Sequence, residues 1–346
     1  MTNHGMYEEF LKYFLILLLL VVDVFSQQHP NSGIDSLLNS GIEQILSQDY
    51  HLSKNTFELL DEQHSNIPLG KIYLVANEIA RTVDYEEDFH EEYIDSILNL
   101  ADEQTAELLD YDDEDLWYNY YSALIQGYKA YYKAITNNII TAFSNGVNSL
   151  QNFQVCLEID PKFYEAYIAI GAYNYWKSKQ TKSLSWLPFV SDNRAEGIEY
   201  LEEAVKHSTY NYYLAANSLI WIYIDNDQSG KAVELSSKML ELFPESRFFR
   251  WGLARAYEDL DTNKAIETYL EILSSVETLN ERNYFNDIVL KHKVAMLYNR
   301  QGKNKIALNL CNEILDFEIN SDLINNRLAS RIERVKKLRQ ILLSEK

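Results

Sequence analysis

Two acidic tracts contain the residues whose types and spacing come nearest to metal chemistry. DYEEDFHEEY (84–93) and DYDDED (110–115) gather carboxylates, which are the ligands that Ca²⁺ prefers in proteins. From Asp110 the second tract follows the alternating carboxylate spacing of a calcium-binding loop, but Tyr121 stands where that loop needs its bidentate glutamate. We therefore predict no metal site and interpret both tracts as solvent-facing acidic surface.

Sequence motifs that support catalysis are missing from this chain. His90-Glu91 begins an H-E-x-x-H pattern on a predicted helix, but Ile94 occupies the position of the second histidine. The sequence contains no G-x-S-x-G, no phosphate-binding P-loop and no G-x-G-x-x-G. We expect no catalytic residue, no cofactor and no enzymatic activity.

Charge is divided unevenly along the sequence. Its 31 Lys and Arg residues against 52 Asp and Glu residues give a net charge of −21. Residues 27–160 contain five basic and 24 acidic residues, whereas residues 161–346 contain 25 of each. Because a nucleic-acid backbone requires clustered Lys and Arg and would meet repulsion here, we exclude nucleic acid as a partner.

Composition predicts a helical protein. Gly (11) and Pro (5) are too few for a chain of many short strands, and 47% hydrophobic residues suffice for a packed core. The two cysteines, Cys156 and Cys311, fall on apolar faces of predicted helices, where a lone cysteine is usually a small buried hydrophobe. We expect both to be structural.

Residues 1–26 are predicted to be a signal peptide. The apolar run YFLILLLLVV (13–22) has about half the length of a membrane-spanning helix, and Ser26 suits a cleavage site before Gln27. Two acidic residues ahead of this run are atypical, so an uncleaved helix at a membrane stays open as an alternative. Since Asn-x-Ser/Thr sequons are also absent, we expect a bacterial protein that is exported to the periplasm or cell envelope.

Helix pairs recur through the second half of the chain. In 213–246, for example, YLAANSLIWIYIDN precedes GKAVELSSKMLELFPES, with apolar residues at the spacing of amphipathic helices. Small residues recur where the two helices of a pair would cross, as at Gly171 and Gly197, although Ile220 takes such a position in the second pair. Further helices are predicted as one degenerate pair in 34–67, at 69–83 with 89–109, at 114–135 with 137–159, and at 322–344.

These units resemble the tetratricopeptide repeat, a helix pair of about 34 residues with small residues at fixed positions. The resemblance covers roughly 34–321 and implies an all-α superhelix of stacked helix pairs. The chain is similar to exported bacterial tetratricopeptide proteins of unassigned role and, more distantly, to the eukaryotic inclusion-body clearance family of the same repeat. After the signal peptide we expect an acidic region of degenerate repeats (27–160), clearer repeats (161–321) and a C-terminal capping helix (322–346).

The resemblance also implies a partner-binding groove, because the first helix of each tetratricopeptide unit lines the concave face. Trp and Arg, which are enriched at binding hot spots, occur at several of the implied positions. Trp251 and Arg255 are one helical turn apart, a spacing at which the guanidinium can stack on the indole. Packing of these aromatic side chains between the repeats stays open as the alternative. The implied groove residues are Tyr175, Trp176, Asn217, Trp221, Trp251, Arg255, His292 and Arg300.

An insertion at 177–193 departs from the repeat. Gly171 and Gly197 are 26 residues apart where the repeat uses about 12. An apolar tip in this insertion should not stay in water, so we expect it to fold back on the protein or to contact a partner. The tip residues are Trp186, Leu187, Pro188 and Phe189.

These features together favour a non-enzymatic, exported scaffold that binds a peptide or protein partner on its concave face. Its acidic first half would offer a separate surface to a basic partner. One alternative is a membrane-associated component of an envelope assembly or transport system, held by the N-terminal segment or by the final helix, where 322–346 has seven basic against three acidic residues. The other is a helical-repeat enzyme or small-ligand receptor that uses the insertion as a lid.

Overall fold

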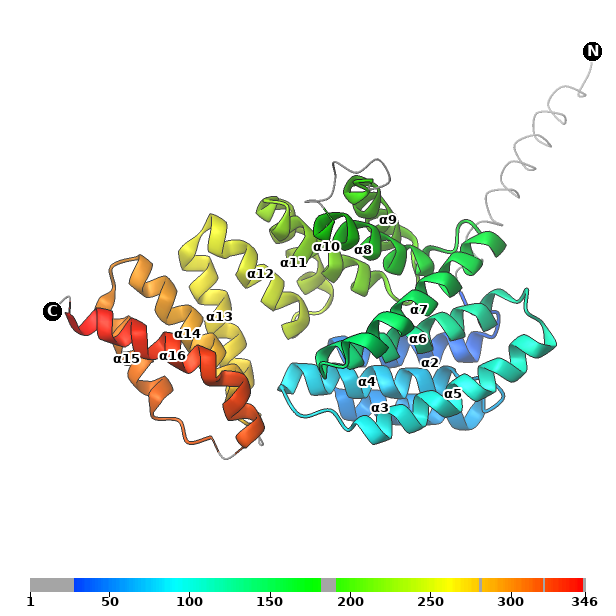
Figure 1. Cartoon of the computed structure of the whole chain (residues 1–346), viewed down its shortest axis with the longest axis horizontal. Coiled ribbons are helices and arrows are strands. Elements are labelled where there is room, and N and C mark those ends of the chain that lie inside the picture. The colour runs from blue at the N-terminus through cyan, green and yellow to red at the C-terminus, as the bar shows by residue number, and fades with distance from the viewer. Residues whose placement is uncertain (1–27, 182–190, 280–281, 320, 345–346) are drawn as a thin grey trace, which may run out of the picture.

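The chain folds into helices stacked along a curved path (Figure 1). In the computed structural model every regular element of the described residues is a helix, so the predicted all-α fold is confirmed. Within the same residues no helix combines the length and the apolar character needed to cross a membrane. The described residues are 28–181, 191–279, 282–319 and 321–344.

Two of the predicted features lie outside the described residues. One is the signal peptide at 1–26, and the other is the apolar tip of the insertion. Both therefore remain predictions from sequence. The tip residues concerned are Trp186, Leu187, Pro188 and Phe189.

Three helix pairs form the acidic N-terminal region. The sequence patterns placed the ends of the later four of these helices within two residues of where they lie. Asp115, from the second acidic tract, caps the N-terminus of one of them by accepting hydrogen bonds from the N–H groups of Trp117 and Tyr118. The helices are α2 (Ser32–Leu46), α3 (Tyr50–Gln63), α4 (Leu69–Tyr85), α5 (Glu91–Tyr111), α6 (Leu116–Ile135) and α7 (Ile139–Ile159).

Four further pairs and a terminal helix follow. The terminal helix packs on the two helices before it and buries one apolar stripe, as expected of a cap on the last repeat. The helices are α8 (Tyr164–Gln180), α9 (Arg194–His207), α10 (Tyr212–Asp225), α11 (Ser229–Leu242), α12 (Arg247–Leu260), α13 (Thr262–Glu277), α14 (Phe285–Arg300), α15 (Asn304–Leu315) and α16 (Asp322–Ser344).

The helices form two layers. Each helix packs on the next one along the chain, and even-numbered helices also contact one another, as α4 does with α6 and α10 does with α12. Even-numbered helices therefore make up the inner layer of the superhelix and odd-numbered helices the outer layer (Figure 1). This arrangement gives the inner helices the concave surface.

Helices α8 and α9 cross at two glycines whose backbones touch. A methyl group on Gly171 would lie 2.7 Å from the carbonyl oxygen of Gly197, and one on Gly197 would lie 2.6 Å from the carbonyl oxygen of Gly171. A larger residue at either position has to push two helix backbones apart. The small residues of the repeat pattern are therefore required here by direct backbone contact.

Gly171→Ala is expected to lower the free energy of unfolding by about 1–3 kcal/mol, because the added methyl group overpacks this crossing. Urea denaturation followed by circular dichroism measures the change. Gly230→Ala is the control, since no atom lies within 4 Å of a methyl group at that exposed position of α11. The control should leave stability unchanged or slightly raised. Equal stability of the two variants would show that backbone contact does not explain the glycine.

Ile220 breaks the small-residue pattern, and the structure shows how it is accommodated. Its Cγ2 atom would lie 2.5 Å from a methyl group on Gly252, in the next inner helix. The bulk of Ile220 on α10 is thus matched by the absence of a side chain on α12. The two positions compensate each other across neighbouring repeats.

The N-terminal and C-terminal regions of the superhelix are tied together by Asp84, at the end of α4. Its carboxylate accepts two hydrogen bonds from the guanidinium of Arg247 on α12, one of them 2.9 Å long, and a third from the Tyr50 hydroxyl at 3.0 Å. Both charged side chains are buried, with exposed fractions of 12% for Asp84 and 6% for Arg247. The interpretation of the tract 84–93 as solvent-facing surface is wrong at this residue, because a distant helix covers it.

Further contacts reinforce this junction. Arg327 on α16 donates to the Glu86 carboxylate and to the Glu86 carbonyl oxygen. Asn283 donates to the carbonyl oxygens of Tyr85 and Glu86, and Asn286 donates to that of Asp84. The end of α4 is therefore held by three separate segments of the C-terminal repeats, and we call these contacts the junction.

Aromatic side chains fill the interior of the N-terminal repeats. Trp117 packs against the rings of Tyr120, Tyr121, Phe163 and Tyr210 at centroid distances of 5.7–6.5 Å. All four partners are at most 1% exposed. Much of the tyrosine-rich composition is therefore core packing in this part of the chain, as the packing alternative for the aromatic residues supposed.

Both cysteines are buried and free, as expected of structural residues. Burial raises the pKa of the Cys156 thiol to about 12 and that of the Cys311 thiol to about 11. Neither side chain is a thiolate at neutral pH, so neither has the reactivity of a redox or catalytic cysteine.

Candidate partner-binding site

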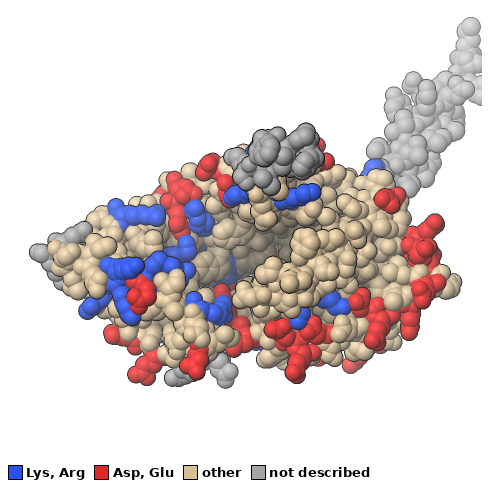
Figure 2. All heavy atoms as spheres, viewed as in Figure 1, with Lys and Arg blue, Asp and Glu red and all other residues tan. Residues whose placement is uncertain are grey.

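A hollow lies between the C-terminal repeats and the α6–α7 hairpin, and Figure 2 shows it with Lys and Arg side chains gathered on the C-terminal side. Acidic side chains cluster instead on the outer rim of the N-terminal repeats in the same view (Figure 2). The inner helices α8, α10, α12, α14 and α16 supply the C-terminal side of this concave surface. This surface is the candidate site.

Two of the implied groove residues are exposed tryptophans on consecutive inner helices. Trp176 on α8 is 37% exposed and Trp221 on α10 is 38% exposed. The Lys179 ammonium lies 5.4 Å from the centroid of the Trp176 ring, a cation–π contact. Large aromatic surfaces that remain in water on an inner layer are available to a partner.

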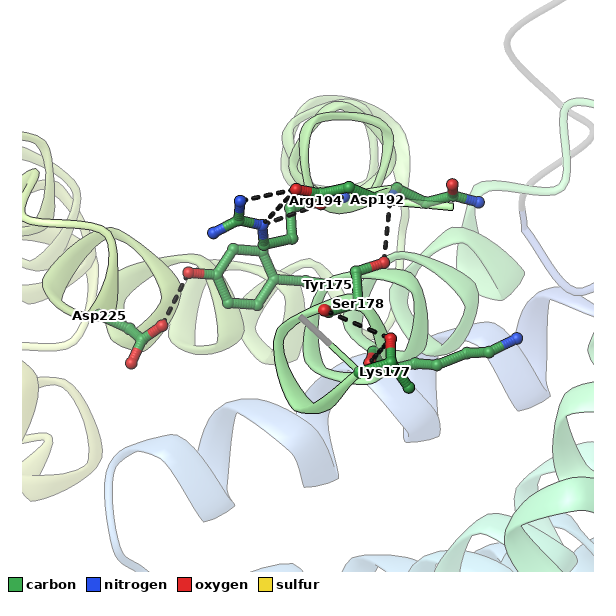
Figure 3. Close-up of polar contacts among 8 residues, drawn as sticks. Tyr175, Lys177, Ser178, Asp192, Arg194 and Asp225 are labelled. Atoms are coloured by element: carbon green, nitrogen blue, oxygen red, sulfur yellow. Dashed lines mark hydrogen bonds and ion pairs between the residues drawn. The ribbon is translucent and has the colours of Figure 1, made fainter. Parts of the chain in front are cut away.

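Tyr175 is buried and connects the inner helices α8 and α10. The expectation that it lines an open groove is therefore wrong. Its hydroxyl donates to Asp225 on α10 over 2.8 Å, as Figure 3 shows. Lys179 donates to the same carboxylate. Although burial works in the opposite direction, these hydrogen bonds keep the pKa of Asp225 below its usual value.

The two ends of the insertion are held together beside this contact between α8 and α10. The Asn193 N–H donates to the Ser178 hydroxyl over 2.9 Å, and Arg194 forms an ion pair with Asp192 (Figure 3). The insertion therefore leaves and rejoins the fold at one point, next to the exposed ring of Trp176.

Trp251 and Arg255 on α12 do not stack. Trp251 is half-buried and packs edge-on against Tyr269 at a centroid distance of 5.9 Å. Arg255 pairs instead with Asp259, one turn further along the helix, over 2.9 Å. Within the described chain no cation lies over the Trp251 ring. The stacking of Arg255 on Trp251 that their spacing allows is therefore not formed.

A charged network crosses from α12 to α14. Glu258 accepts hydrogen bonds from the Lys293 ammonium at 2.8 Å and from the Tyr269 hydroxyl. Burial opposes ionisation of Glu258, but these two donors hold the pKa of its carboxyl below the usual value. The hydrogen bonds of Glu258 therefore hold α12 and α14 in a fixed relative position.

The remaining implied residues differ in exposure. Arg300 at the end of α14 is exposed, whereas His292 on the same helix is only 3% exposed and contacts α16. Asn217 is half-buried, and its Oδ1 atom accepts no hydrogen bond from any described residue. His292 is thus part of a packed interface and not of an open groove.

Two arginines that the repeat resemblance did not imply lie beside His292 of the inner helix α14. Arg331 on α16 donates toward the Nδ1 atom of His292 over 3.4 Å, and Arg334 follows one turn later. The excess of basic residues in the terminal helix was the available sequence signal. It could not show that these side chains reach the inner layer, because that depends on how α16 packs on α14.

A separate apolar surface lies on the α6–α7 hairpin. Ile139, Ile140 and Phe143 have exposed fractions of 60%, 87% and 74%, and Tyr131 and Ile135 on α6 are 49% and 44% exposed. From Ile139 to Leu157, helix α7 contains no charged residue. This is the second surface of the molecule with the character of an interface.

Metal ligation finds no support in the geometry. Within the described ranges no group of three or more His, Cys, Asp or Glu side chains is arranged to hold a metal ion. Asp112 and Asp115 of the calcium-like tract accept backbone hydrogen bonds within their own turn.

Comparison with solved structures supports the helical-repeat fold. No protein-family model and no curated protein matches the sequence. Among solved structures, the Cut9–Hcn1 hetero-tetramer of the APC/C matches with 14% identity and a TM-score of 0.52, over 90% of this chain and 52% of that one. PilW, described as a widely conserved type IV pilus biogenesis factor, matches with 19% identity and a TM-score of 0.47, over 71% and 97%. YrrB, described as a TPR protein with an unusual peptide-binding site, matches with 13% identity and a TM-score of 0.41, over 65% and 97%.

Proposed function

We propose that this tetratricopeptide-repeat superhelix is a non-enzymatic scaffold that binds a segment of a protein partner on the C-terminal part of its concave surface. The fold supports a scaffold role by analogy, since repeat superhelices present extended concave surfaces suited to binding. The segment would lie across the inner helices α8 to α16.

One observation carries this proposal. Trp176 and Trp221 expose more than a third of their surface on consecutive inner helices, whereas the aromatic residues inside the N-terminal repeats are packed away. Exposing two indole rings costs solvation free energy that a partner recovers when it covers them. Lys and Arg side chains on the C-terminal side of the hollow can add hydrogen bonds to the partner (Figure 2).

The Trp176→Ala/Trp221→Ala double variant is expected to bind its partner at least about tenfold more weakly, since each ring is a hot-spot side chain. The measurement is cross-linked capture from the native host by tagged full-length protein, followed by a binding titration with the captured partner. Soluble and membrane fractions are treated separately.

Tyr111→Ala/Leu242→Ala is the matched control, because these side chains are equally apolar but lie exposed on outer helices. A partner lost in the tryptophan variant and kept in the control supports the concave surface. A partner kept in both contradicts the proposal and directs attention to the apolar surface of α6–α7.

We also propose that the protein is exported, on the strength of the predicted signal peptide at 1–26. The alternative of a membrane-associated component of an envelope assembly rests on the same segment left uncleaved. Recovery of the partner complex only from the membrane fraction, resistant to salt, would favour that alternative.

A further inference from the structure

Helix α16 presents a row of arginines to the inner layer. Arg327, Arg331 and Arg334 follow one another at helical spacing on the side of α16 that faces α14 and the junction. Arg339 lies toward the other side, where it donates to Asn312 of α15 over 2.6 Å. The arginine row therefore lies on the side of α16 that faces the inner layer.

Among the described residues, the first arginine of the row is the one that has an acidic partner. Arg327 is paired with Glu86, which the chain itself places there from the end of α4. Neither Arg331 nor Arg334 forms an ion pair with any described residue. Arg331 contacts only the ring nitrogen of His292, and Arg334 donates only to the hydroxyl of Ser330.

The three arginines of α12, in contrast, each form an ion pair with a carboxylate. Arg247 is paired with Asp84, and Arg255 is paired with Asp259. Arg250 is likewise paired, with Glu271. Arg331 and Arg334 differ from these three in lying together beside an imidazole without an ion pair to a described residue, so their charges are not compensated within the described chain.

The cations of this cluster affect one another. Burial, together with the charge of Arg334, lowers the pKa of Arg331. Burial and the charges of Arg331, Arg334 and Lys293 lower the pKa of His292 to about 4, so its ring is neutral at physiological pH. An anion placed between the two guanidinium groups removes this repulsion.

We propose that Arg331 and Arg334, beside the buried ring of His292, form a subsite for a carboxylate side chain of the bound segment, so that the partner is acidic where it crosses the last repeat. This inference rests on the proposed scaffold function and names the chemistry of its partner. The planar forks of Arg331 and Arg334 match a carboxylate, as the guanidinium of Arg247 already does with Asp84.

A carboxylate is favoured over a polymer of phosphates by what surrounds the subsite. The facing N-terminal repeats belong to the region with five basic and 24 acidic residues, which repels any long polyanion, so the anionic part of the bound segment must be short, unlike a continuous phosphate backbone. Glu86 on Arg327 shows that the neighbouring arginine of the same row holds a carboxylate in this fold. A short acidic segment continues that pattern along α16.

The test uses a fluorescein-labelled hexaglutamate peptide titrated into the full-length protein and followed by fluorescence anisotropy at low ionic strength. The Arg331→Gln/Arg334→Gln variant is expected to raise the Kd about tenfold. The Lys336→Gln/Lys337→Gln control removes two charges from the exposed faces of the same helix, and it should raise the Kd less than about twofold. Equal weakening by both variants, or no weakening by either, overturns the subsite.

A second measurement keeps the inference independent of folding and of the proposed function. The Cε1 chemical shift of His292 in histidine-labelled protein is followed at neutral pH. Bound hexaglutamate should move this signal, whereas inorganic phosphate at equal concentration should move it less. An equal shift with phosphate overturns the carboxylate assignment. The Trp176→Ala/Trp221→Ala variant should bind hexaglutamate normally, so loss of the native partner with this peptide binding intact separates failure of the subsite from failure of the scaffold proposal.

Discussion

Asp84→Ala is expected to lower the free energy of unfolding by about 3–5 kcal/mol, because it leaves the buried guanidinium of Arg247 without its counter-charge. The substitution also removes the acceptor of the Tyr50 hydroxyl. Replacing only one partner of a buried ion pair costs more than the pair itself contributes, since the remaining charge stays desolvated. Urea denaturation followed by circular dichroism measures the change.

The control for this prediction is Asp113→Ala, which removes the same charge from an exposed position of the second acidic tract. It should leave stability within error of the unsubstituted protein. Because Asp84 joins segments 163 residues apart, small-angle scattering should also show a larger radius of gyration for Asp84→Ala. Equal stability of the two variants would contradict the role of the junction in closing the superhelix.

Glu165→Ala is expected to cost a comparable amount, about 3–5 kcal/mol, because one buried carboxylate serves the start of a whole helix. Its oxygens accept hydrogen bonds from the N–H groups of Thr209, Tyr210 and Asn211 at 2.7–3.1 Å, and from the Asn211 side chain at 2.8 Å. Each buried donor left without an acceptor costs about 1–3 kcal/mol. The residue is 2% exposed, so little water reaches these donors in its place.

The conservative variant Glu165→Gln separates hydrogen bonding from packing. Its amide keeps the side-chain volume but turns N–H groups toward the Asn211 amide, which already donates to Glu165 and to the Tyr120 hydroxyl. We expect an intermediate loss, partly restored when Asn211→Asp is added, because that change supplies an acceptor for the new amide. Hydrogen exchange at the start of α10 provides the local readout. If Glu165→Gln lost nothing, the four hydrogen bonds would not be the source of the stability.

Burial raises the pKa of Glu165, while the hydrogen bonds from Tyr210, Asn211 and Thr209 oppose the rise. Glu165 on α8 connects three inner helices. It binds the residues that begin α10, and Asn211 links it to the Tyr120 hydroxyl of α6. A charged residue at this point in a repeat would ordinarily be interpreted as solvent-facing. Glu165 can accept these hydrogen bonds because the first residues of α10 pack against its side chain.

The sequence alone was sufficient for the helices and their pairing. Apolar residues at helical spacing and small residues at the crossings are local signals, because a helix and its neighbour in the chain are close in sequence as well as in space. The mutual contact of Gly171 with Gly197 is the physical form of that signal. Even the exception at Ile220 is matched in the next repeat along the chain, by Gly252.

The concave surface was only partly predictable. The repeat resemblance implied Trp176 and Trp221, and both are exposed on inner helices. It also implied Tyr175 and His292, which are buried, because the resemblance gives the side of a helix but not the neighbour that covers it. Arg255 pairs with Asp259 and not with Trp251. Both residues lie four positions from Arg255 on the same helix, so the spacing alone does not distinguish the two partners.

What only the tertiary structure decided are the contacts between distant turns of the superhelix. These contacts depend on the overall curvature of the superhelix, which is the sum of many small rotations between repeats. They are the pairs Asp84–Arg247, Glu86–Arg327 and Arg331–His292. No local pattern encodes that sum, so the acidic tract at 84–93 gave no sign that it would meet the basic terminal helix. The sequence by itself determined which helices form and which neighbours they pack on. The accumulated curvature determined which charges meet between distant repeats, and it left Arg331 and Arg334 without an ion pair to any described residue.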